Sequence, residues 1–261
     1  MRIQTRVAAL VATLAVVLGV AGCTDDAVIK PEAGTKKPVA AASVKAAKPP
    51  ARLTTATFAP VTLAANAKVK SWTGVMRMSL NGQVVTATIA QTYKPTAMRM
   101  DMSGPQFGGV AHAILINGVL YLQLPIPRAR GKYLKFDSKT KDPTAAAFAQ
   151  LFAAADPTNG DKVLRKALVK VKFVASDTVG FRKVDRYDLT MNNAAMLRVL
   201  GVKPPAGMPK TSVQSLWIGA DRLTYKQTSS GGGSQTQVTV TGYNTAGTIR
   251  APSAKMIIKT G

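Results

Sequence analysis

From residue 71 onward, apolar and polar side chains alternate over long stretches of the chain. On one face, the first stretch, SWTGVMRMSL, collects Trp72, Met76, Met78 and Leu80. A period of two is the pattern of a β-strand that buries one face. Asn-Gly follows at 81–82 and recurs at 117–118, and this dipeptide favours a tight turn between antiparallel strands. The sequence therefore predicts a large antiparallel sheet.

Helical patterns occupy three shorter segments. Two begin with Asp-Pro, at 142–143 and 156–157, where aspartate is a good N-cap and proline fits the first helical position. The third spans 193–200 and stops at Gly201. We expect about ten strands and three short helices. The predicted fold class is α+β, with the helices covering the concave face of a large, curved antiparallel sheet.

The apolar face of such a sheet must be covered, and the predicted helices are short and rich in alanine. Small side chains pack loosely, so an apolar cavity could remain, and methionine suits surfaces that adapt to varied apolar shapes. The alternative is a filled core in which methionine fills gaps. For a cavity, the sheet would supply Trp72, Met76, Met78, Val85, Ile89, Met98, Met100, Met102, Ile114, Ile116, Leu120 and Leu122. The helices would supply a lid of Phe148, Leu151, Phe152, Met196 and Leu197.

The N-terminus has the pattern of an export signal. Residues 1–22 combine early arginines with a short apolar core, too short for a membrane span of about 20 residues. The following residue, Cys23, is the only cysteine in the chain. Val20-Ala21-Gly22-Cys23 resembles a bacterial lipobox, which implies that Cys23 is acylated and becomes the mature N-terminus. The alternative is an ordinary signal peptide with a chance cysteine.

The chain then divides into two parts. Residues 23–65 would form the lipidated N-terminus and a flexible tether, because alanine, lysine and proline dominate and large apolar side chains are scarce. Residues 66–261 are long enough for one domain with a hydrophobic core.

The charge balance narrows the choice of partners. The formal net charge is +23, from 35 Lys and Arg against 12 Asp and Glu. In an exported protein, anionic lipids or wall polymers are better partners for this charge than nucleic acid. Lys162, Arg165 and Lys166 would contact an anionic headgroup or the membrane, or would simply form a solvated helix face.

Catalytic and metal-binding patterns are weak. The stretches SKTK at 138–141 and KTG at 259–261 match elements of penicillin-binding enzymes but lie in unsuitable contexts. One cysteine and one histidine leave no Cys- or His-rich metal site. His112 alternates with isoleucines on an expected strand, which favours a structural role. We therefore expect neither an enzyme nor a cofactor.

Residues 66–261 resemble the actinobacterial LppX/LprG-type lipoproteins, whose fold is similar to that of the carriers LolA and LolB. The resemblance rests on Leu216-Trp217-Ile218 with the following turn, on the strand 239–243 and on the ending Ile249-Arg250-Ala251-Pro252. It implies a half-barrel closed by helices. It also implies an exported, membrane-anchored protein that shields acyl chains in an apolar cavity. The turn 219–221 departs from the family, because the acidic residue comes later.

Together these features predict a lipoprotein on the extracytoplasmic face of the cell membrane. It would bind acylated lipids or glycolipids and carry or present them in the cell envelope, with an envelope transporter as a further partner and no nucleic acid. The alternative is a basic surface lipoprotein without an internal ligand cavity. Such a protein would adhere to anionic lipids or wall polymers, or dock a membrane partner.

Overall fold

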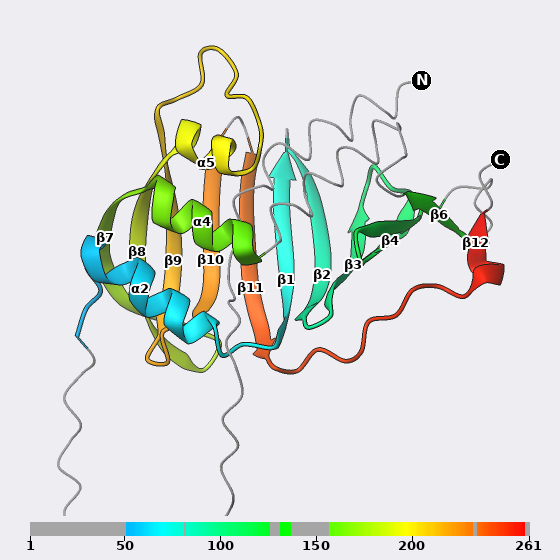
Figure 1. The fold of residues 1–261 in the computed structure, drawn as a ribbon, viewed down its shortest axis with the longest axis horizontal. Coiled ribbons are helices and arrows are strands. Elements are labelled where there is room, and N and C mark those ends of the chain that lie inside the picture. The colour runs from blue at the N-terminus through cyan, green and yellow to red at the C-terminus, as the bar shows by residue number, and fades with distance from the viewer. Residues whose placement is uncertain (1–50, 81, 126–130, 137–156, 232–233, 259–261) are drawn as a thin grey trace, which may run out of the picture.

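The computed structural model describes residues 51–80, 82–125, 131–136, 157–231 and 234–258 (Figure 1). Within these ranges, twelve strands form one sheet in the order β12-β6-β5-β4-β3-β2-β1-β11-β10-β9-β8-β7. The strands are β1 (Ser71–Leu80), β2 (Gln83–Tyr93), β3 (Thr96–Gly104), β4 (Gly109–Ile116), β5 (Val119–Gln123), β6 (Tyr133–Phe136), β7 (Leu168–Val179), β8 (Arg182–Asn192), β9 (Thr211–Gly219), β10 (Thr224–Gly231), β11 (Ser234–Tyr243) and β12 (Ile257–Ile258). A 3-10 turn, η2 (Ala254–Met256), precedes β12.

The sheet is antiparallel apart from the parallel β6–β12 pair, and it is open. Tight hairpins join most neighbours, and Asn117 and Gly118 both have positive φ, as the predicted Asn-Gly turn between β4 and β5 requires. Pairing of β1 with β11 joins the two halves of the chain. The predicted α+β fold with a large antiparallel sheet is therefore confirmed.

Within the described ranges, three α-helices lie on one face, here called the inner face, over the half of the sheet built from β7–β11 (Figure 1). They are α2 (Thr55–Asn66), α4 (Pro157–Ala167) and α5 (Asn193–Val199). Thr54 and Thr57 form a capping box at the start of α2, and Asn192 caps α5. The main helix–strand contacts join α2 and α4 to β7 and α5 to β8. No helix among the described residues is long and apolar enough to cross a membrane.

Helix α2 corrects the predicted boundary between tether and domain. The fold already begins near Leu53, because this residue, Phe58 and Leu63 are buried. The alanine-rich composition and Pro60 made the segment look like a linker, but its apolar residues pack on the sheet. The helix expected from residue 156 ends at Ala167, where β7 follows at once. The expected helix at 142–155, Cys23 and the signal segment lie outside the described residues.

Two apolar clusters share the inner face. The methionine cluster lies on β1–β5 and β11, and the aromatic cluster lies between the helices and β7–β9. One row of paired residues crosses both, in the order Tyr187, Leu216, Gln227, Val238, Met76, Ala87, Met102 and Ala111. Gln227 lies at the border, where its Nε2 donates a hydrogen bond of 2.8 Å to Oε1 of Gln214.

Candidate functional site

The methionine cluster brings together most of the predicted sheet residues. Ten of them lie in it: Trp72, Met76, Met78, Val85, Ile89, Met98, Met100, Met102, Leu120 and Leu122. Ala87, Ala111, Ala113 and Val238 complete the cluster. Every member is at most 6% exposed. The cluster is therefore shielded from solvent in this structure, and its side chains must move apart for a ligand to enter.

Pairing across the strands explains why methionine suits this surface. Met76 pairs with Ala87, which pairs in turn with Met102, and Met100 pairs with Ala113. Long, flexible side chains thus stand beside short ones. Because methionine has three rotatable bonds and a polarizable sulfur, it can change rotamer over its alanine neighbours at little cost. The surface can adapt its shape without moving the backbone.

Ile114 and Ile116 lie elsewhere, which corrects their predicted place on the inner face. In β4, Ala111 and Ala113 face the methionines, so the alternate positions point to the outer face. There Ile114 packs with Ala97, Tyr121 and Ile249, and Ile116 packs against this group. The C-terminal segment covers this outer face, so β4 buries apolar residues on both sides. The size of the side chains in β4 therefore did not reveal which side faces the methionines.

Aromatic and polar side chains close one end of the methionine cluster. The Trp72 ring lies over Gly74, where an added Cβ would come within 2.8 Å of the ring and of the Thr239 carbonyl oxygen. The indole Nε1 donates a hydrogen bond of 2.9 Å to Oε1 of buried Gln91. Tyr93 and Tyr243 pack against the cluster at this end. A polar group is thus satisfied inside an otherwise apolar surface.

The tyrosines at this end remain neutral phenols at physiological pH. Burial raises the pKa of Tyr93, and the Asp161 charge raises it further, although the contact with Trp72 opposes the shift. Burial likewise raises the pKa of Tyr243, whose hydroxyl donates to the Thr224 carbonyl oxygen. Burial and the hydrogen bond to Asp221 raise the pKa of Tyr225 to about 12. These groups supply hydrogen bonds and no charge.

Of the predicted lid residues, two are described, and neither belongs to the methionine cluster. Met196 of α5 is buried in the aromatic cluster, and Leu197 is half-buried. The reason is that α5 packs on β8 and on α4, far along the sheet from β1–β5. Phe148, Leu151 and Phe152 lie outside the described residues, so their place in a lid stays a prediction.

The aromatic cluster is built differently from the methionine cluster. The Tyr187 ring packs edge-on against both Phe58 of α2 and Phe173 of β7, with centroids 5.9 and 5.8 Å away. Its hydroxyl accepts a hydrogen bond of 3.1 Å from the backbone N–H of Leu53. Rigid rings and a fixed hydrogen bond lock α2 onto the sheet.

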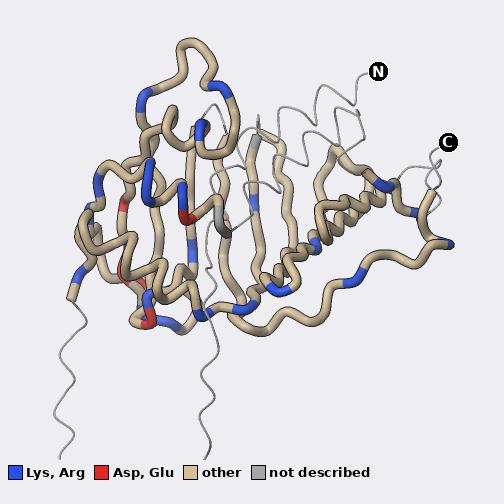
Figure 2. Tube along the Cα trace, in the orientation of Figure 1, with Lys and Arg blue, Asp and Glu red and all other residues tan. Residues whose placement is uncertain are grey.

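The basic side chains of α4 are exposed. This exposure is compatible with both predicted roles, contact with an anionic headgroup or membrane and a solvated helix face. Lys162, Arg165 and Lys166 are all exposed. Figure 2 shows the basic positions along this helix. Asp161 is less exposed, and burial raises the pKa of its carboxyl group, although the Arg165 charge opposes the shift. Its Oδ1 atom has no hydrogen-bond partner among the described residues.

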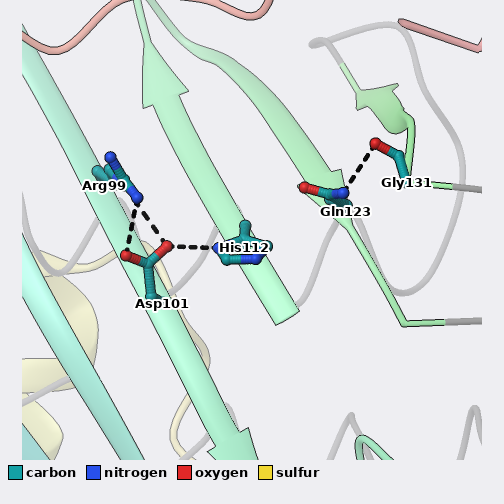
Figure 3. Close-up of polar contacts among 5 residues, drawn as sticks. All are labelled: Arg99, Asp101, His112, Gln123 and Gly131. Atoms are coloured by element: carbon teal, nitrogen blue, oxygen red, sulfur yellow. Dashed lines mark hydrogen bonds and ion pairs between the residues drawn. The ribbon is translucent and has the colours of Figure 1, made fainter. Parts of the chain in front are cut away.

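His112 belongs to a polar trio on the outer face. Its Nδ1 lies 2.6 Å from Oδ1 of Asp101, and Arg99 Nη2 lies 3.1 Å from Oδ2 of the same carboxylate (Figure 3). A histidine oriented by an aspartate is part of many hydrolytic triads. In the part of the chain that the structure describes, His112 is hydrogen-bonded to Asp101 and to no hydroxyl group. The described residues also contain no group of acids, cysteines and histidine suited to hold a metal.

Sequence reasoning missed several members of the site. Ala111 and Ala113 were overlooked because the isoleucines beside them looked better suited to an apolar face. Val238 joins the cluster only through the pairing of β1 with β11, which no local pattern reveals. Gln91 could have been found from the sequence, because it lies on the same face of β2 as Val85 and Ile89, between Ile89 and Tyr93.

No protein-family model matches the sequence, and no curated protein sequence matches it. Solved structures do match the fold. The Mycobacterium tuberculosis lipoprotein LppX superposes with a TM-score of 0.52 at 11% identity, over 75% of this chain and 98% of LppX. LprF from Mycobacterium bovis superposes with a TM-score of 0.54 at 14% identity, over 76% of this chain and 96% of LprF. The chain therefore has the fold of LppX and LprF, as the resemblance in its sequence implied.

Proposed function

We propose that the protein is an exported, membrane-anchored lipoprotein that binds the acyl chains of lipids or glycolipids at its methionine cluster. The observation that carries the proposal is this cluster itself: a wide, apolar, adaptable surface on the half of the sheet away from the main helix contacts. The fold shared with LppX, which is described as a lipoprotein, supports the same class of function.

Burial of hydrocarbon would drive binding. Each CH₂ group removed from water contributes about 0.8 kcal/mol, so a long acyl chain gains several kcal/mol even after its ordering is subtracted. The cluster needs no charge or reacting group for this purpose. We expect the thioethers of Met76, Met100 and Met102 to change rotamer around the chain, because closed packing must open for a ligand to enter.

The proposed location follows from the N-terminal sequence. Acylation at Cys23 would anchor the protein at the extracytoplasmic face of the cell membrane, since two acyl chains give stable attachment. In that place it would carry or present lipid within the envelope and pass it to or from a transporter. Lys162, Arg165 and Lys166 are proposed to contact an anionic headgroup from the exposed side of α4.

Native mass spectrometry tests the proposal. The chain from residue 23 onward, with Cys23→Ser to remove the anchor, is purified without detergent and examined for bound lipid. It is then delipidated and titrated with a fluorescent fatty acid. We expect co-purified lipid and saturable uptake of the probe at one site. A protein that carries no lipid and takes up no probe would contradict the proposal.

A matched pair of variants locates the binding. Met100 and Met191 are both 1% exposed, but they belong to the methionine cluster and the aromatic cluster, respectively. Met100→Gln places a polar amide of similar shape where the acyl chain would lie, and we expect about a tenfold loss of probe affinity. Met191→Gln should destabilise the fold to a similar extent but leave the affinity of the folded protein unchanged.

The competing interpretation is a basic surface protein with a filled core, favoured by the net charge of +23. It predicts no probe uptake, together with vesicle binding that disappears at high salt. The titration above separates the two, because burial of an acyl chain is insensitive to salt.

A further inference from the structure

We infer that one edge of the sheet, the exit edge, is a docking surface for an anionic lipid bilayer. The exit edge is defined by the β7–β8 turn (Gly180–Phe181), the β9–β10 turn (Ala220–Leu223) and the place where the chain enters the fold at Ala51. This inference is independent of lipid binding at the methionine cluster, because it concerns how the domain lies on a membrane surface.

Phe181 is the first observation. It is 92% exposed, by far the most exposed large apolar side chain among the described residues. It stands at the tip of a two-residue hairpin in which Gly180 has a φ of 61°. An aromatic ring at the tip of a rigid hairpin is presented away from the domain at little entropic cost. Such a ring is suited to insertion between lipid headgroups.

Positive charge surrounds this ring. Arg182 and Lys183 follow Phe181, and the Arg182 guanidinium lies 5.6 Å from the Phe181 ring centroid and 4.8 Å from that of Tyr225. Arg222 lies in the next turn. Further along the same edge are Lys68 and Lys70, just before β1, and Lys94, just after β2; this end of β1 pairs with the ends of β2 and β11. Figure 2 shows basic positions spread along this edge. Each basic residue near an anionic membrane strengthens binding several-fold.

The carboxylates near this edge are engaged by the protein itself. Asp221 accepts hydrogen bonds from the Tyr225 hydroxyl and from the backbone N–H of Leu223. Asp177 accepts from the Trp217 indole, and Asp185 accepts from the Ser176 hydroxyl. Among the described residues, no salt bridge joins Arg182 or Lys183 to a carboxylate, so their charge favours an anionic partner.

The chain outside the described fold ends at this same edge. The Arg222 Nη2 atom donates a hydrogen bond of 3.0 Å to the Ala51 carbonyl oxygen, and the Leu53 N–H is held by Tyr187. Residues 24–50 separate Ala51 from Cys23, so a membrane anchor at Cys23 would be joined to the exit edge. The tether keeps the edge at high local concentration near the bilayer, and Phe181 with its cations would then fix the orientation.

Vesicle binding tests this inference on the chain from residue 23 onward with Cys23→Ser, so that no acyl chain holds the protein. The vesicles contain phosphatidylglycerol and phosphatidylcholine in equal parts, with pure phosphatidylcholine for comparison. We expect binding to the anionic vesicles only. Phe181→Ala should weaken it roughly tenfold, and Arg182→Gln with Lys183→Gln should weaken it by at least as much at low salt.

Matched controls lie at the opposite end of the sheet. Lys203→Gln with Lys210→Gln removes the same charge, and Val110→Ala shortens another exposed apolar residue, 48% exposed. Both should leave vesicle affinity within about twofold of the parent chain, since they lie far from the exit edge. If the two charge pairs weaken binding equally, general electrostatic attraction explains it and the inference is wrong.

Phe181→Trp tests insertion directly through tryptophan fluorescence, without relying on a loss of binding. Trp72 and Trp217 are both buried, so a new tryptophan at the tip dominates any change in emission. We expect a blue shift with anionic vesicles and quenching by lipids brominated on their acyl chains. An unshifted, unquenched emission from bound protein would overturn the insertion of this residue. Uptake of the fluorescent fatty acid without vesicles stays unchanged in every exit-edge variant, which keeps this test separate from the proposed function.

Discussion

The two halves of the inner face bury their apolar side chains in different ways. Over β7–β9, helices α2, α4 and α5 lie on rings and branched side chains, and Tyr187 packs edge-on between two phenylalanines. Over β1–β5, methionines alternate with alanines, and Trp72 is the only aromatic ring in the buried cluster. The first half is fixed by its own helices. The second half is closed but adaptable, which is what a surface for varied acyl chains requires.

The largest expected effect compares two leucines. Leu189 and Leu122 are both almost fully buried, the first in the aromatic cluster and the second in the methionine cluster. We expect Leu189→Ala to lower the free energy of unfolding by about 4 kcal/mol and Leu122→Ala by about 2.5 kcal/mol, because methionines refill the space beside Leu122. Denaturant unfolding measures both. Equal losses would show that the two halves are equally rigid.

Gly74→Ala tests the aromatic end of the methionine cluster. The new Cβ would meet the Thr239 carbonyl oxygen and the Trp72 ring at 2.8 Å, and the backbone atom cannot move away cheaply. We expect a loss of about 2 kcal/mol in unfolding free energy and a red shift of Trp72 emission. Gly231→Ala is the control, since nothing lies within 4 Å of its added Cβ. A loss of stability in the control comparable to that of Gly74→Ala would refute this explanation.

Tyr187→Phe tests the helix-covered half. It removes the acceptor of the Leu53 N–H without changing the packing of the ring. We expect a loss of about 1 kcal/mol and faster hydrogen exchange at Leu53, because the segment leading into α2 loses its tie to β8. Exchange in β1–β5 should not change. Unchanged exchange at Leu53 would mean that this hydrogen bond does not hold the segment.

The smallest effect concerns the outer face of the adaptable half. Partial burial by itself raises the pKa of Asp101, but hydrogen bonds and charges from His112 and Arg99 outweigh this and hold its pKa below the usual value. A lowered folded-state pKa stabilises the fold above the unfolded value near pH 4, and this contribution disappears as the pH falls through the folded-state pKa. Asp101→Asn should therefore cost about 0.5 kcal/mol at pH 7 and nothing at pH 2, since the group is solvent-screened. Unfolding at both pH values measures this, and an equal cost at both would contradict it.

Strand alternation and Asn-Gly turns were enough to predict the sheet and the inner face of β1–β3. Met98, Met100 and Met102 share a face because their spacing leaves no other choice. The alternation of apolar residues did not place Ile114 and Ile116 correctly. The reason is that β4 is covered on both faces, and alternation does not say which face of the strand is the inner one. Helix α2 escaped detection because alanine, threonine and Pro60 resemble a linker until its packing partners are known. Met196 was misplaced because the assignment of helices to sheet halves depends on pairings distant in sequence.

Photo-crosslinking with a diazirine-bearing fatty acid tests the central claim most directly. The delipidated chain is irradiated with the probe, digested, and the labelled residues are identified by mass spectrometry. Label concentrated on the inner positions of β1–β5, with Met76, Met100 and Met102 foremost, is the predicted result. Label confined to the helices and β7–β9, or scattered over the exposed surface, would contradict an acyl-chain site at the methionine cluster.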